Sequence, residues 1–468
     1  MNNFKIALMP KRTQSFWQLA GPGAILVGLA IGVGEIVVWP RIIAEYGATV
    51  AWAAVVGIFL QLWINLEIGR WTISTGETPF TGFSRIWGGF APIFLILIIL
   101  GYLVPGWARA SGLALKALIV GPFGYGSDTF WTVITFSIAG IILFGPKIVY
   151  QSVERCVEIL VLIVTVGLIS VVIAVGSKEV WIELGVGIIN IGKTHPDISV
   201  KTLFSALVFA GIGGASNLFY SFYLRDKNIG MGKRIPRLTN PLRGRSEAAP
   251  SKGFLFEETE QNISRYKNWW SYIIKDQIIF FWLLSTFTII LFMYGALAVL
   301  NPRGIVPAPG TLIWDEAIVL KEIWGDIGKN IFLLVGVAAL FGTQLVILDG
   351  VSRSFADIIY TNLKFAQKRN VSWWYLTVCL AWIVFGCIIT YVMDNRGVTE
   401  LGFIFNAGYM AGFAMAVYVP LLLYMNYRYL PKSVKPGILS TIMMIIASFV
   451  YIGFALSSIR WEIMSLIG

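Results

Sequence analysis

Runs of apolar residues, each about twenty residues long, recur along the whole chain and are separated by polar connections. Because about 20 residues of α-helix cross the hydrocarbon core of a bilayer, each run predicts one transmembrane helix. We therefore expect an all-α polytopic membrane protein of about eleven transmembrane helices. The predicted spans lie near residues 19–39, 50–70, 92–119, 129–146, 153–175, 202–224, 276–299, 330–358, 373–393, 400–426 and 437–458.

Glycine and charge interrupt the centre of the first predicted span. Residues 21–40 read GPGAILVGLAIGVGEIVVWP, with Gly32, Gly34 and Glu35 in the middle of the run. Glycine in a helix interior costs about 1 kcal/mol relative to alanine, and a charged side chain at membrane depth costs at least about 2.5–3.5 kcal/mol on insertion scales. A helix that only had to span lipid would carry neither feature, so this stretch predicts a functional break.

The sixth predicted span repeats the pattern. Residues 205–224 read SALVFAGIGGASNLFYSFYL, in which Gly211, Gly213 and Gly214 lead into Ser216 and Asn217. Two glycine-interrupted spans, one in each half of a chain, are the best sequence indicator of the binding site of a secondary transporter. We therefore expect the two breaks to meet near the bilayer midplane and to hold a small ligand between them.

Lysine and arginine in the connections predict the orientation. Alternate connections carry the basic residues, and the opposite connections are sparser or mixed in charge; the basic set is Lys5, Lys11, Arg12, Arg70, Arg85, Lys147, Arg155, Lys364, Lys368, Arg369, Arg428, Lys432, Lys435 and the basic loop 225–275. The N-terminal residues 1–18 are therefore expected in the cytoplasm, with the loop 176–201 and the C-terminus on the opposite side of the cell membrane.

Composition supports this interpretation and excludes several function classes. The 468 residues are 57% hydrophobic and 13% charged, whereas soluble domains carry about 25% charged residues. The net charge of +11 follows from the basic connections and requires no nucleic-acid partner. The one histidine, His195, lies in an outer loop, which excludes a membrane-embedded histidine relay. No phosphate-binding GxxxxGK[ST] loop or HExxH motif occurs, so we expect neither an ATP-driven pump, nor an enzyme, nor a cofactor.

The loop 225–275 is the one long break in the apolar pattern. Its first part is basic and rich in proline and glycine, which predicts a flexible segment on the inner surface. Its second part predicts an amphipathic helix with Trp269 and Trp270 at the membrane interface, near anionic lipid headgroups. A regulatory or partner-docking role is the alternative.

Several polar residues in the spans are candidates for the site. Glu35 follows a Gly-x-Gly break, where freed backbone carbonyls can bind a cation. Ser216 and Asn217 could supply hard oxygen ligands or a hydrogen bond between helices. We expect Gly32, Gly34, Gly211 and Gly214 to contribute backbone around the ligand.

Three further charged positions could couple or gate transport. Asp349 has Arg353 one helical turn later, so the two could neutralise each other. Glu67 and Arg70 lie near the inner interface, which favours a stabilising or gating ion pair. Arg109 falls about mid-span in the third helix, where it could pair with Glu35, Glu67 or Asp349 or bind a carboxylate of the ligand.

These segments resemble the natural resistance-associated macrophage protein (Nramp) family of divalent metal transporters, within the amino acid–polyamine–organocation superfamily. The first span resembles the family's helix that begins GPG and carries the motif DPGN, the four positions of which are here Gly32, Val33, Gly34 and Glu35. The sixth resembles the family's MPHNLY segment, here Gly214, Ala215, Ser216, Asn217, Leu218 and Phe219. Weaker likeness covers LQLWINLEIGRWTISTGETPF, the eighth span at Gly342, Thr343, Asp349 and Gly350, and the tenth at Val419 to Leu423.

The resemblance implies a LeuT-type fold of two inverted five-helix repeats, residues 19–175 and 202–426, with broken first and sixth helices and an extra helix at 437–458. It implies a divalent metal as cargo, held by Glu35, Asn217 and Gly32. The family's aspartate, methionine and histidine are absent here. Loss of the soft sulfur favours a hard cation held by oxygen, Mg²⁺ or Mn²⁺.

Two other functions stay open at this point. One is an organic-solute transporter on the same fold, in which Arg109 binds the carboxylate of an amino or carboxylic acid. The other is a non-transporting membrane sensor acting through the loop 225–275. The coupling ion, the direction of flux and the oligomeric state are not indicated by the sequence.

Overall fold

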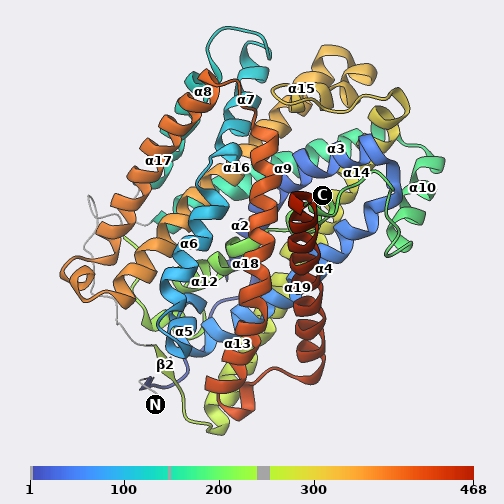
Figure 1. Cartoon of the computed structure of the whole chain (residues 1–468). Coiled ribbons are helices and arrows are strands. Elements are labelled where there is room, and N and C mark those ends of the chain that lie inside the picture. The colour runs from blue at the N-terminus through green and yellow to red at the C-terminus, as the bar shows by residue number, and fades with distance from the viewer. Residues whose placement is uncertain (1–3, 20, 146–148, 240–252, 468) are drawn as a thin grey trace.

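The computed structural model describes residues 4–19, 21–145, 149–239 and 253–467, which form a bundle of long helices (Figure 1). Within those residues, eight helical runs are long and apolar enough to cross a membrane. The first run, Pro22–Thr75, has 54 residues, more than two crossings of about 20 residues need. Gly47, with a φ of 66°, divides it into the first two predicted spans. The protein is therefore a multi-pass membrane protein.

Each of the eleven predicted spans corresponds to a helix or to consecutive helices. The first five are α2 (Pro22–Ala30) with η1 (Ile31–Val38) and α3 (Trp39–Tyr46); α4 (Ala51–Thr75); α6 (Phe90–Tyr102) with α7 (Gly106–Ile119); α8 (Asp128–Phe144); and α9 (Val149–Val175). The others are α11 (Val200–Phe209) with η3 (Gly214–Phe219) and α12 (Tyr220–Asp226); η5 (Gln277–Leu284) with α14 (Ser285–Gly295) and η6 (Ala296–Leu300); α16 (Ile318–Asn362); α17 (Val371–Asn395); α18 (Glu400–Tyr429); and α19 (Ile438–Ile467). The all-α prediction is confirmed.

The first and sixth spans are broken where their glycines predicted it. In η1 the backbone leaves helical geometry at Gly32, which has a φ of −66° and a ψ of −121°. In the sixth span α11 stops at Phe209, and η3 begins after Gly213. Gly213 and Gly214 have φ values of 70° and 59°, in the left-handed region that favours glycine. Both breaks are buried within the bundle.

The third span is also divided, which the sequence did not predict. α6 ends at Tyr102 and α7 begins at Gly106, with Pro105 between them. Proline lacks an N–H and disfavours helix in the residue before it, so the helix stops and restarts there. The restart places Arg109 in the first turn of α7 and not in the middle of one continuous helix.

Two connections differ from the sequence predictions. The outer loop 176–201 contains a helix, α10 (Lys178–Ile189). The loop 225–275 lies partly outside the described residues, at 240–252, but its start is buried: Gly230, Met231 and Gly232 in η4 (Gly230–Arg234) pack on α4. That part of the flexible-segment prediction is wrong, because these residues fit against the end of the second span.

The second part of the loop forms α13 (Glu260–Asp276), which continues directly into the seventh span. Trp269 is buried there and donates to the Pro10 carbonyl at 2.8 Å, so the prediction that it lies at the membrane interface is wrong. The strand β1 (Lys5–Ile6) pairs in parallel with β2 (Phe254–Leu255). We call residues 4–12 the N-terminal strap, because they run along α13 at the end of the bundle opposite α15 (Leu312–Glu316) (Figure 1).

Candidate substrate site

A cavity of about 40 Å³ lies between the two broken spans. Its walls come from η1, the α6–α7 junction, the α11–η3 break, α16 and α18. The lining includes no charged side chain; apart from Tyr102, Ser216 and Thr343 it is apolar or glycine, with Leu29, Val33, Gly34, Gly101, Val104, Gly106, Trp107, Phe209, Gly211, Ile212, Ile347, Phe403, Ile404 and Ala407. The place is the one predicted from the two glycine breaks.

Two glycines let the broken backbones approach closely. A side chain at Gly34 would overlap the Phe209 carbonyl oxygen, so the first and sixth spans touch through backbone there. A side chain at Gly32 would overlap Thr343 Oγ1, which donates to the Leu29 carbonyl at 3.3 Å. The first break is therefore fixed between the sixth and eighth spans.

Hydroxyl groups line the sixth-span side of the cavity. The Tyr102 hydroxyl is hydrogen-bonded to Ser216 Oγ, and both residues line the cavity. The Tyr418 hydroxyl donates to the Gly214 carbonyl at 2.9 Å. These contacts hold the start of η3 against α6 and α18 and leave two hydroxyl groups for a ligand.

Asn217 points away from the cavity, toward α4. Its Nδ2 donates to Asn65 Oδ1 at 2.9 Å and to Gln61 Oε1 at 3.3 Å. The same Gln61 oxygen accepts from the backbone N–H groups of Ile212 and Gly213, at 2.8 and 3.0 Å, and Gln61 Nε2 donates to the Val208 carbonyl at 2.9 Å. Sequence reasoning missed Gln61, although a lone amide in an apolar span is a signal for this role.

Glu35 is buried but faces the seventh span. Its Oε2 accepts from Thr288 Oγ1 of α14 at 2.6 Å, and its Oε1 has no hydrogen-bond partner in the described structure. Neither Glu35 nor Asn217 lines the cavity. The described residues contain no group of three or more His, Cys, Asp or Glu side chains that could hold a metal ion. In this structure the side chains of Glu35 and Asn217 are hydrogen-bonded to different spans, α14 and α4.

Arg109 does not line the cavity, and its partners differ from the three acids expected from the sequence. Its Nη2 pairs with Asp128 at 2.8 Å, and its Nη1 donates to the Val398 carbonyl at 2.6 Å. Asp394 and Glu400 lie 3.7 and 3.9 Å from the same guanidinium. Asp128 begins α8, so a partner from a polar helix start, not from a span centre, neutralises Arg109.

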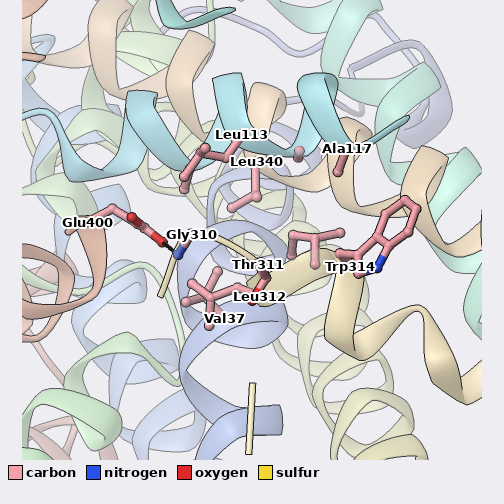
Figure 2. Close-up of a pocket in the computed structure, with 12 residues that line it drawn as sticks. Val37, Leu113, Ala117, Gly310, Thr311, Leu312, Trp314, Leu340 and Glu400 are labelled. Atoms are coloured by element: carbon pink, nitrogen blue, oxygen red, sulfur yellow. Dashed lines mark hydrogen bonds between the residues drawn. The ribbon is translucent and has the colours of Figure 1, made fainter. Parts of the chain in front are cut away.

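Glu400 joins this cluster to the outer connection. Figure 2 shows its carboxylate reaching the Gly310 N–H, at 2.7 Å, beside Thr311 and Leu312. Together with α7 and Val37 these residues enclose a second, smaller cavity of about 10 Å³ (Figure 2). The outer side of the first span is thus covered by the segment that precedes α16.

The other two candidate charges form ion pairs within single helices. Glu67 pairs with Arg70 in α4 at 3.0 Å and accepts from Asn426 Nδ2 at 2.7 Å. Asp349 pairs with Arg353 in α16 at 2.8 Å and accepts from the Tyr375 hydroxyl at 2.8 Å. All are buried, and none lines the cavity. The hydrogen bonds from Asn426 and Tyr375 join these pairs to α18 and α17.

No family model matches the chain, and no curated protein matches it. Among solved structures, the chain is similar to a manganese transporter of Eremococcus coleocola, with a TM-score of 0.64 and 14% identity over 100% of this chain and 92% of that one. It is also similar to MhsT in complex with L-phenylalanine, with a TM-score of 0.53 and 14% identity over 96% and 98% of the two chains.

A third solved structure has the same architecture. It is Mhp1, a nucleobase-cation-symport-1 family transporter in a closed conformation with bromovinylhydantoin bound, with a TM-score of 0.54 and 14% identity over 96% and 93% of the two chains. At such identities the likeness concerns the fold, and it does not extend to membership of the Nramp family. The chain has the LeuT fold that these transporters share.

Proposed function

We propose that the chain is a secondary transporter that carries a small organic solute with an apolar body by alternating access. The cavity between the two broken spans is the observation that carries this proposal. A cavity needs about 10–15 Å³ to hold a water molecule, so its 40 Å³ accommodates roughly three water-sized groups in the present conformation. The cargo is therefore compact, about the size of a small amino acid.

The backbone at the breaks provides partial charges of opposite sign beside the apolar cavity. The first span leaves helical geometry at Gly32, and α11 ends at Phe209, so the helix segments before these breaks present carbonyl oxygens with partial negative charge. η3 and α12 begin at Gly214, where backbone N–H groups carry partial positive charge. In broken-helix transporters, amino ends face anionic groups and freed carbonyls face cations. A zwitterion fits this arrangement without any charged side chain.

Alternating access requires contacts that open on one side while those on the other side close. The Arg109 cluster and the Glu400–Gly310 bond are the proposed outer contacts. The Asn426–Glu67 hydrogen bond and the Arg353–Asp226 pair, each of which joins two different spans, are the proposed inner ones. On this proposal Arg109 acts in gating and does not read the carboxylate of the cargo, because it does not line the cavity.

The test is uptake by the purified full chain in liposomes, screened against small amino acids and organic acids. Ser216→Ala and Tyr102→Phe each remove a hydroxyl from the cavity, and should weaken cargo binding by about 1 kcal/mol, or roughly fivefold. Ser221→Ala is the matched control, because the Ser221 hydroxyl donates to the Leu218 carbonyl at 2.6 Å and does not line the cavity. Equal affinity in all three variants would place the cargo elsewhere.

A divalent cation, Mg²⁺ or Mn²⁺, is the second candidate cargo, favoured by the resemblance to the Nramp family and by the fold shared with a manganese transporter. Against it, burying a divalent charge without a carboxylate is strongly unfavourable, and Glu35 points to Thr288. Glu35→Gln should weaken cation binding in calorimetry if that carboxylate turns inward. Cation flux without uptake of any organic solute would favour a metal ion as the cargo.

We also propose that the N-terminus is cytoplasmic and the C-terminus lies outside the cell membrane, as the basic connections predict. Single cysteines introduced at exposed positions of α10 and of α13 should label from opposite sides. A non-transporting sensor acting through the loop 225–275 is the remaining alternative, and full cargo flux after deletion of residues 240–252 would count against it.

A further inference from the structure

Glu316 is a buried acid that the proposed transport cycle has not used. It is the last residue of α15, in the outer connection before α16, and only 1% of its surface is exposed. Neither carboxyl oxygen has a hydrogen-bond partner in the described structure. Every other acid discussed above accepts a hydrogen bond or pairs with a cation, so Glu316 requires a separate explanation.

The carboxyl group borders a cavity of about 10 Å³. Six elements meet at this cavity, among them α3 with Pro40, α9 with Leu168, α14 with Phe292 and α16 with Phe332. The other lining side chains are equally apolar. An ionised carboxylate without a donor or a cation in such surroundings costs several kcal/mol, and buried carboxyl groups take up a proton instead.

No cation among the described residues pairs with Glu316. Burial raises the pKa of Glu316 well above the ordinary value for glutamate, and repulsion from Asp315, the residue before it, raises it further. Lys321 of α16 is exposed, and three other cations on the surrounding elements have their own contacts. Arg41 of α3 pairs with Glu45 and donates to the Pro307 carbonyl, Arg303 after η6 donates to the Val299 carbonyl, and Lys329 of α16 pairs with Asp326.

We propose that Glu316 is a proton-binding site, occupied when the outer connection is packed on the first span and emptied when that packing opens. Opening separates Pro40 from α15, lets water reach the carboxyl group, and releases one proton to the outer medium. Closing requires that the group take one proton back. The link to cargo rests on the proposed transport function, but proton binding itself does not.

Infrared spectroscopy and thermal melting test proton binding without any cargo. In the purified full chain at neutral pH, the protonated carboxyl should give a carbonyl band that disappears in Glu316→Gln and shifts in frequency in Glu316→Asp. Asp326→Asn is the control, because the Asp326 side chain is 79% exposed on the same outer segment. That variant should leave the band unchanged.

Melting provides the independent readout. Because the pKa is raised in the folded state, the contribution of Glu316 to wild-type stability is fully present below about pH 4.3, the ordinary pKa of glutamate, and is lost as the pH rises toward the raised value. Glu316→Gln removes this decline, so its Tm should exceed that of the wild type at neutral pH and converge with it near about pH 4.3. The proposal would be overturned if the Tm of the wild type and that of Glu316→Gln changed with pH in parallel and the carbonyl band were the same in both proteins.

The two proposals can fail separately. If uptake of every solute is absent while the band and the melting shift behave as expected, proton binding stands and transport of these solutes does not. If Glu316→Gln does not fold, Glu316→Asp carries the test: an unshifted carbonyl band in that variant would refute the assignment. If cargo uptake is observed and Glu316→Gln transports with an unaltered dependence on external pH, the coupling of this proton to the cycle is refuted.

Discussion

Gln61 supports the break in the sixth span more directly than any residue of that span. Its amide accepts from two backbone N–H groups of the break and donates to the Val208 carbonyl, with distances between 2.8 and 3.0 Å. Gln61→Leu would leave these three buried backbone groups without partners. Each such group costs about 1–3 kcal/mol, so at about 1–2 kcal/mol apiece the variant should lose roughly 3–6 kcal/mol of stability.

The assay is thermal melting of the purified full chain, read beside cargo uptake. A loss of 3 kcal/mol at roughly 2 °C per kcal/mol predicts a Tm lower by about 6 °C or more. Gln344→Leu is the matched control: Gln344 is equally buried, but in the described structure neither of its amide atoms has a hydrogen-bond partner. Removing that amide should be neutral or stabilising, because no partner is orphaned.

A Gln61→Leu variant with the same Tm as the wild type, or as Gln344→Leu, would refute the reasoning. It would mean that the broken backbone satisfies its polar groups elsewhere. Gln61→Glu separates the two roles of the amide, since it keeps the acceptor and removes the Nε2 donor to Val208. An intermediate Tm is expected from that variant.

Three other substitutions have defined outcomes. Gly32→Ala should destabilise by about 1–3 kcal/mol through overpacking and abolish uptake, whereas Gly453→Ala, which meets open space in α19, should raise or preserve the Tm. Arg109→Gln should lower the Tm by breaking a mostly buried ion pair, while the Kd for cargo in calorimetry stays unchanged; a large rise in Kd would return Arg109 to the binding site. Trp269→Ala should cost about 3–5 kcal/mol in urea unfolding, in contrast to Trp461→Ala at a position 54% exposed; equal effects would refute the burial of Trp269.

The spans and their breaks could be predicted because both are local properties. A membrane helix must satisfy its own backbone hydrogen bonds, so the length of each apolar run indicates a crossing. The glycines at 32 and 213 mark where backbone leaves the helix, as the φ and ψ values show. The position of the cavity follows from the pairing of the two breaks.

The direction of each side chain was not predictable, because it depends on helix rotation and on distant partners. Glu35 directly follows Gly34, which lines the cavity, but its side chain is hydrogen-bonded to Thr288, 253 positions later in the sequence. Arg109 was placed at mid-span because the length of an apolar run does not show that a helix is divided within it, although Pro105 and Gly106 are the local signal of that division. Trp269 was assigned to the lipid interface because the residue that covers it, Pro10 of the N-terminal strap, lies 259 positions away in the sequence.

The N-terminal strap couples the start of the first span to α13. Met9 and Pro10 are bonded to Asn262, Arg265 and Trp269 of α13, while the Gly23 N–H at the start of the first span donates to Asp276 at the other end of that helix. In the proposed transport cycle, movement of the start of the first span must therefore either carry α13 with it or break these hydrogen bonds. A bulky fusion at the N-terminus should then shift the equilibrium between the two proposed open states, so a tag at this end is itself a perturbation.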